Sequence, residues 1–288
     1  MKKNNFPRLA VLLSVLLGGY SDFALLNPSG AVGQEQKNII LTALGLMSLV
    51  VVPVIVLTLV FAWRYRASNK KAAYAPNWAH STKIEIVVWL IPAIIIVILG
   101  ALVLKSSHKL DPYRPLDSAV KPIVIEAVSL DWKWLFIYPQ QQVATVNQLV
   151  FPANVPVEFR ITSVNVMNSF FIPQLGSQIY AMPGMRTQLH LIADAPGSYD
   201  GISSNYSGRG FSDMKFKAIA ASQDDFNRWL DKVKRSTVKL DLARYKELEA
   251  PSDKNPVAYF SSIKPGLFGC ILHQYMPADA KTQACEEN

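Results

Sequence analysis

The chain has 288 residues and a formal net charge of +8, yet only 17% of its residues are charged, against roughly 25% in ordinary soluble proteins. This composition excludes a disordered chain, a collagen-like fibre and a disulfide-dense small domain. The low share of charged residues argues against a wholly soluble protein, so we follow the apolar segments along the chain.

The first apolar segment covers residues 9–19 and follows Lys2, Lys3 and Arg8. A short apolar run behind basic residues is typical of a secretory signal peptide, and it is too short for a comfortable membrane span. We therefore predict a signal peptide or membrane anchor over residues 1–20.

Two longer apolar segments follow. Residues 39–63 contain no charged side chain, and residues 84–104 carry one acid, Glu85, at their start. Each segment is long enough to cross about 30 Å of hydrocarbon at about 1.5 Å per residue. The sequence thus predicts a transmembrane helical hairpin over residues 36–106.

The segment between these two spans is basic, with no acid before Glu85. The positive-inside rule places it in the cytoplasm and everything after Lys105 outside. Topology explains much of the basic excess, and no basic stripe interleaved with aromatic residues remains, so we expect membrane lipid and no nucleic acid as partner. The basic residues are Arg64, Arg66, Lys70, Lys71 and Lys83.

Short strand-like segments bounded by proline and glycine begin near residue 123 and predict a β-sandwich over residues 121–220. Beyond it, apolar residues recur at helical spacing, which predicts a helical C-terminal arm over residues 221–288. The clearest strand segments are residues 123–128, 157–161, 187–192 and 214–219, and the clearest helical segments are 224–230 and 240–248. The fold class expected is thus membrane α plus all-β.

Four sequence blocks in this region resemble subunit II of the haem-copper terminal oxidases. The blocks are Asp131-Trp132-Lys133-Trp134, residues 167–173, residues 181–185 and residues 205–214. The resemblance extends from about residue 34 to residue 220, and the arm resembles the aromatic-rich C-terminal arm of that family. It implies that the sandwich is cupredoxin-like and extracytoplasmic.

The copper-containing branch of that family holds a binuclear copper centre with histidine, cysteine, glutamate and methionine ligands. Thiolates and imidazoles suit copper in electron transfer, whereas hydroxyl groups and a phenyl ring do not. Laid on this chain, the ligand positions carry Asn168, Ser203, Asn205, Ser207, Phe211 and Met214, so only the methionine is retained. The resemblance therefore implies that this subunit holds no metal and no cofactor.

A copper-free subunit of this kind resembles the quinol oxidase branch, the cytochrome bo type. The resemblance implies a non-redox subunit II of a proton-pumping ubiquinol oxidase in a bacterial inner membrane, with its C-terminal domain in the periplasm. It would stabilise subunit I, which would hold the haems, the copper and ubiquinol, and it would not bind cytochrome c. The alternatives are a copper-containing cytochrome c oxidase subunit II and a stand-alone membrane receptor with an empty cupredoxin fold.

Glu85 matches the family's glutamate at the entrance of a proton channel into subunit I, although an acid at a span boundary can also be simply solvated. Quinol oxidase subunits of this type usually carry a lipidated cysteine after the signal peptide. Here Tyr20 stands at that position, which excludes thioether lipidation. Either another peptidase cleaves the chain, or residues 9–19 stay as an anchor, or the tyrosine replaces a natural cysteine.

The two cysteines, Cys270 and Cys285, both lie in the arm. In an oxidising compartment they either form one disulfide or remain free thiols.

Overall fold

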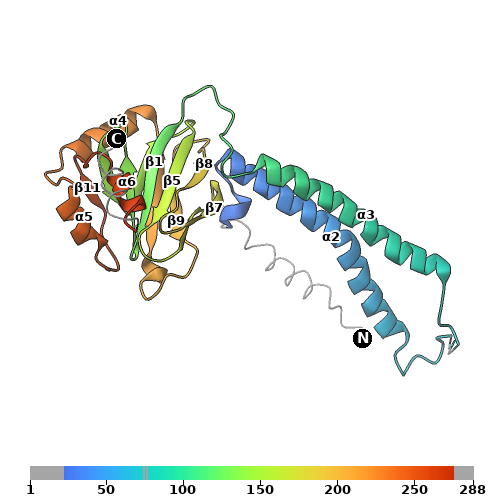
Figure 1. Ribbon diagram of the computed structural model, residues 1–288. Coiled ribbons are helices and arrows are strands. Elements are labelled where there is room, and N and C mark those ends of the chain that lie inside the picture. The colour runs from blue at the N-terminus through green and yellow to red at the C-terminus, as the bar shows by residue number, and fades with distance from the viewer. Residues whose placement is uncertain (1–22, 74, 76, 276–288) are drawn as a thin grey trace, which may run out of the picture. The chain divides into compact units, whose positions relative to one another are not determined.

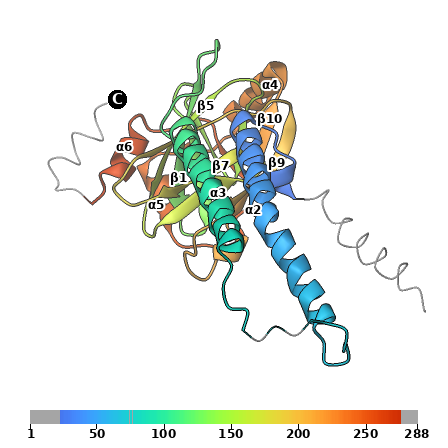
Figure 2. The ribbon, with the colours of Figure 1, turned by 90° about the vertical axis from the view of Figure 1, so that its right-hand side faces the viewer.

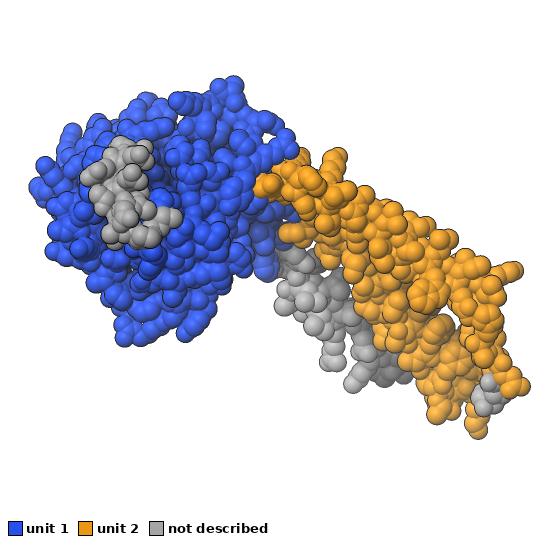
Figure 3. Space-filling view, in the orientation of Figure 1, with its two compact units in different colours: residues 1–36, 112–288 blue, residues 37–111 orange. Residues whose placement is uncertain are grey.

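The computed structural model of the chain describes residues 23–73, 75 and 77–275 (Figure 1). The chain divides into two compact units (Figure 3). We call residues 37–111 the helical unit, and the segments on either side of them the sandwich unit.

The helical unit is built from two long helices, α2 (Ala31–Arg64) and α3 (Thr82–Lys109), joined by residues 65–81 and running in opposite directions (Figure 2). They begin and end a few residues outside the predicted hairpin. At 1.5 Å per residue they are about 51 and 42 Å long, more than the roughly 30 Å of a hydrocarbon core. Most of their large apolar side chains are exposed. Such a surface is stable in lipid, so these two helices anchor the chain in a membrane.

The first residues of α2, up to Gln36, belong to the sandwich unit, as does the short 3-10 helix η2 (Ala24–Leu26) that precedes α2. The amide of Ser29 donates to the carbonyl oxygen of Gln174 at 2.7 Å, and the amide of Asp194 donates to that of Ser29 at 2.8 Å. A Cβ on Gly30 would lie 2.2 Å from the carbonyl oxygen of Ile192, so only glycine allows this close approach.

The sandwich consists of two sheets (Figure 1). Neighbouring strands are antiparallel except for the pairs β1–β5 and β4–β10. Sheet A has the order β11 (Ala258–Phe260), β3 (Val143–Val146), β2 (Lys133–Tyr138), β1 (Ile123–Leu130), β5 (Val157–Ser163) and β8 (Thr187–Leu191). Sheet B has the order β4 (Gln148–Pro152), β10 (Lys215–Ala221), β9 (Gly197–Ser203), β6 (Asn168–Ile172) and β7 (Gly176–Ala181).

Aromatic rings fill the space between the two sheets. Phe170 of sheet B lies at the centre, with ring centroids 5.3 Å from Trp134, 5.1 Å from Phe159 and 5.2 Å from Phe216. These buried rings account for the alternating apolar pattern of the strands, because every second side chain points into this layer.

A second apolar core covers the outer face of sheet A. On β2, Trp134 and Phe136 belong to the aromatic cluster, whereas Leu135 and Ile137 pack with side chains of the C-terminal arm. Strand β2 is therefore buried on both faces along its whole length. The residues that the arm contributes to this core are Leu240, Tyr245, Phe260, Leu267, Phe268 and Ile271.

The arm is helical, as predicted, with α4 (Gln223–Lys234), α5 (Leu242–Glu249) and α6 (Leu267–Leu272). Ser222 caps α4 by accepting a hydrogen bond from the amide of Asp225. Strand β11, which the sequence patterns did not predict, pairs with β3 at the edge of sheet A. The arm thus completes the sandwich instead of standing apart from it.

Candidate functional site

The positions that match copper ligands lie at one end of the sandwich, where β6 begins and β9 ends. Asn168, Ser203 and Met214 are all buried there. The hydroxyl of Ser203 donates to Oδ1 of Asn168, and Nδ2 of Asn168 lies 3.5 Å from the sulfur of Met214. These three side chains, which we call the polar trio, satisfy one another by hydrogen bonding.

The other three positions lie in the loop of residues 204–214, which includes the 3-10 helix η3 (Phe211–Asp213). Nδ2 of Asn205 donates to the carbonyl oxygen of Met167 at 3.0 Å, and the ring of Phe211 packs edge-on against Tyr206 at 5.6 Å. The hydroxyl of Ser207 is buried and has no hydrogen-bond partner among the described residues. None of these contacts joins the polar trio.

These residues do not fit a copper centre. Two amides, two hydroxyls, a phenyl ring and a thioether offer copper neither thiolate nor imidazole. The two best-placed oxygens, those of Asn168 and Ser203, already share a hydrogen bond. Among residues 23–73, 75 and 77–275, no group of three or more histidine, cysteine, aspartate or glutamate side chains could hold a metal ion.

Trp132 lies beside this loop, in the two-residue turn between β1 and β2. Its backbone has a φ of 67°, which is rare for a bulky residue. Its indole Nε1 donates to the carbonyl oxygen of Ser207 at 3.0 Å, and the guanidinium of Arg209 lies 5.7 Å from the ring centroid. A Cβ on Gly210 would lie 2.5 Å from the indole, so the loop approaches the ring closely.

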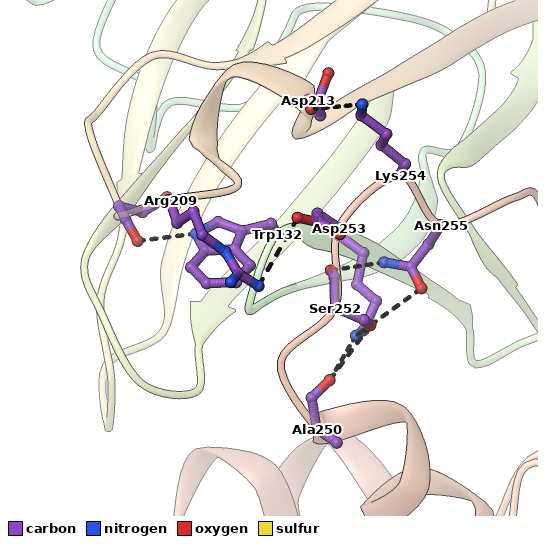
Figure 4. Close-up of polar contacts among 10 residues, drawn as sticks. Trp132, Arg209, Asp213, Ala250, Ser252, Asp253, Lys254 and Asn255 are labelled. Atoms are coloured by element: carbon purple, nitrogen blue, oxygen red, sulfur yellow. Dashed lines mark hydrogen bonds and ion pairs between the residues drawn. The ribbon is translucent and has the colours of Figure 1, made fainter.

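Residues 250–255 of the arm, which we call the strap, cross this region (Figure 4). Nζ of Lys133 donates to the carbonyl oxygen of Ala250 at 2.8 Å and to the hydroxyl of Ser252. Sequence reasoning missed the strap. The available signal was a lysine flanked by two tryptophans in a strand that is otherwise apolar.

Glu85 lies in the first turn of α3, and its side chain is half exposed. Its Oε1 is 2.5 Å from Nδ1 of His80, while Nε2 of His80 is 3.2 Å from the hydroxyl of Thr82. The structure thus pairs the predicted site residue with a histidine that sequence reasoning did not single out, although it lies only five positions earlier.

Three of the predicted residues concern the chain's ends. Cys270 is buried in α6. Tyr20 and Cys285 lie outside the described residues. The absence of lipidation therefore stays a prediction, and a disulfide between the cysteines stays one of the two alternatives expected from the sequence.

The sequence matches two family models. One is described as cytochrome c oxidase subunit II, periplasmic domain, and covers residues 122–221. The other, described as the COX aromatic rich motif, covers residues 234–279, which is most of the arm.

Relatives match along nearly the whole chain. A cytochrome bo(3) ubiquinol oxidase subunit 2 of Pseudomonas putida is 60% identical, over 96% of this chain and 88% of the relative. The subunit of the same name from Pseudomonas aeruginosa is 58% identical, over 97% and 85%. A ubiquinol oxidase subunit 2 of Acetobacter aceti is 53% identical, over 93% and 88%. With the two membrane helices, the sandwich and the arm in place, this chain belongs to the family of subunit 2 of the ubiquinol oxidases.

Proposed function

We propose that this chain is the non-redox subunit 2 of a proton-pumping ubiquinol oxidase in a bacterial inner membrane. It binds and stabilises subunit I, which holds the haems, the copper and the ubiquinol and reduces oxygen to water. The polar trio supports the non-redox role, because hydrogen-bonded amide, hydroxyl and thioether groups stand at the positions of copper ligands. The family membership supports the oxidase and its other subunits as partners.

The proposed orientation of the chain in the membrane rests on the segment of residues 65–81, which connects α2 to α3. Its basic residues favour the cytoplasmic side, which leaves the sandwich unit in the periplasm. Trp63, Tyr65 and Trp78 are exposed at or near the ends of this segment. Aromatic side chains of this kind are enriched at membrane interfaces, so we infer that they contact lipid headgroups.

Two other functions predict different biochemistry. A copper-containing cytochrome c oxidase subunit would need thiolate and imidazole ligands, which these positions lack. A stand-alone receptor would not bind an oxidase. The subunit family of the relatives favours the oxidase over both alternatives.

Purification through a tag on this chain tests the proposal. We expect a haem-bearing membrane subunit to copurify, with quinol-driven oxygen consumption and no reaction with cytochrome c. Copper analysis of the separated subunits should assign copper to the partner alone. A tagged chain that comes away without haem would contradict the oxidase role, and copper in this chain would contradict the non-redox role.

Within that complex we infer that Glu85 is the entrance of a proton path into subunit I. The geometry supports this role, because the carboxylate is accessible at the end of α3 that we place at the cytoplasm and is held by His80. An ionisable side chain in a membrane-spanning helix is costly unless it is solvated or functional, and Glu85 lies in the first turn of such a helix.

A further inference from the structure

The loop 204–214 is held at its ends by the polar trio, and Trp132 contacts its middle through Ser207 and Gly210, but two of its large side chains are exposed. The polar trio holds Ser203 and Met214 at the two ends. Between them, Tyr206 is 75% exposed, and the side chain of Arg209 is 80% exposed. These exposed side chains do not themselves hold the loop, so its order depends on the contacts that other segments make with it.

The strap reaches this part of the loop through two ion pairs (Figure 4). The guanidinium of Arg209 lies 3.9 Å from the carboxylate of Asp253, and the amino group of Lys254 lies 4.0 Å from the carboxylate of Asp213. Exposed ion pairs at these distances stabilise little by themselves. They can hold the loop only if the strap is already fixed in place.

The strap is fixed to the sandwich by partly buried hydrogen bonds. Lys133 is fully buried, and both hydrogen bonds of its amino group end on the strap, at Ala250 and Ser252. A third bond runs from Nδ2 of Asn147 to the carbonyl oxygen of Asn255, at 2.9 Å. These bonds tie both ends of the strap to the sandwich, at the start of β2 and at the residue that follows β3.

A fully buried lysine is costly. Burial lowers the pKa of Lys133, and the nearby carboxylate of Asp131 opposes that effect only in part. Apolar residues fill the rest of β2, and one of similar length at position 133 would avoid the cost of desolvation. The amino group of Lys133 offsets this cost by donating both of its hydrogen bonds to the strap.

We propose that the strap is a conformational device that holds the loop 204–214 in one arrangement, with the buried amino group of Lys133 as its anchor. In this copper-free domain, the polar trio fixes the ends of the loop from inside, Trp132 contacts its middle, and the strap adds contacts from outside at Arg209 and Asp213. The order of the loop therefore depends on the strap, a segment of the arm that is distant from the loop in sequence.

Hydrogen exchange measured by mass spectrometry on the assembled complex tests this device. Lys133→Met keeps the length of the side chain and removes its donors. We expect exchange at residues 204–214 and 250–255 to accelerate by about tenfold or more, because the strap loses its anchor. Residues 134–138 of β2 should keep their protection. Lys217→Met, which removes an exposed lysine paired with Asp200, is the matched control and should leave exchange in the loop unchanged.

A second variant decides the matter if Lys133→Met does not assemble. Asp213→Asn with Asp253→Asn removes both ion pairs and leaves the anchor intact. The loop should then exchange faster while residues 250–255 stay protected. The proposal is wrong if either variant leaves exchange in the loop unchanged, or if Lys133→Met accelerates β2 as much as the loop.

Discussion

Several polar side chains in the sandwich unit occupy positions that apolar residues would fill at lower cost. Asn168 and Ser203 compensate each other by hydrogen bonding, and Lys133 is compensated by the strap. Glu126 on β1 is a further case. It lies beside Arg160 on the neighbouring strand β5, and Arg160 is also paired with Glu158 at 2.9 Å.

Burial raises the pKa of Glu126 to about 7, because the positive charges of Arg160 and Arg186, which lower this pKa, offset only part of the effect of burial. The folded protein therefore binds a proton more tightly than the unfolded chain does. The contribution of Glu126 to stability is complete below its unfolded pKa near 4.5 and is lost as the pH rises through about 7.

Glu126→Gln should remove this pH dependence. Relative to the variant, the native protein should lose about 1–3 kcal/mol of unfolding free energy between pH 5 and pH 8. Thermal unfolding of both proteins across that range measures the difference. Parallel curves would show that the carboxyl is not protonated in the folded state.

At the level of elements, the arm closes the outer face of sheet A. Strand β2 carries apolar side chains on both faces, so without the arm Leu135 and Ile137 would face water. Because β11 also pairs with β3, the arm and the sandwich share one hydrogen-bonded sheet. We therefore expect the two to unfold together.

Phe260→Ala tests this expectation. Phe260 is 3% exposed and belongs to the core between the arm and sheet A. Its truncation should cost about 3–5 kcal/mol of unfolding free energy. Calorimetry should still show one transition for the sandwich unit, at lower temperature. Leu242→Ala, on an exposed side chain of α5, should change little. A separate transition of the arm would contradict a shared core.

At the scale of the whole molecule, the two units have surfaces suited to different surroundings, lipid and water. The helical unit exposes apolar side chains to lipid, and the sandwich unit buries its apolar side chains in two cores. The proposed proton entrance, Glu85, lies at the start of α3 and would lead into subunit I, so its effect is measurable only in the assembled oxidase.

Glu85→Gln should slow quinol-driven oxygen reduction by about tenfold or more while the haem content stays the same, because a neutral amide cannot pass a proton. Turnover and the haem spectrum of the purified complex measure both. Glu247→Gln makes the same change at an exposed ion pair of α5 and should leave turnover intact. Full activity of Glu85→Gln would remove its role as the entrance.

Some features of this protein could be predicted from the sequence, and others could not. The two spans follow from long runs without charge, and the strands follow from the alternation of apolar residues. The expected loss of copper follows from the identity of single residues at matched positions. None of these predictions needs distant segments to be brought together.

The strap, strand β11 and the pairing of His80 with Glu85 could not be predicted in this way. Each joins residues whose side chains show no pattern along the chain. Lys133 and Ser252 are separated by more than a hundred positions and meet only because β2 and the arm share a core.

The sequence alone therefore determined the membrane anchor, the sandwich and the family, since hydropathy, period and local motifs are properties of neighbouring residues. Tertiary structure decided how the loop 204–214 is held. That depends on which buried polar groups find partners, and in a folded chain those partners come from wherever the packing of the cores brings them.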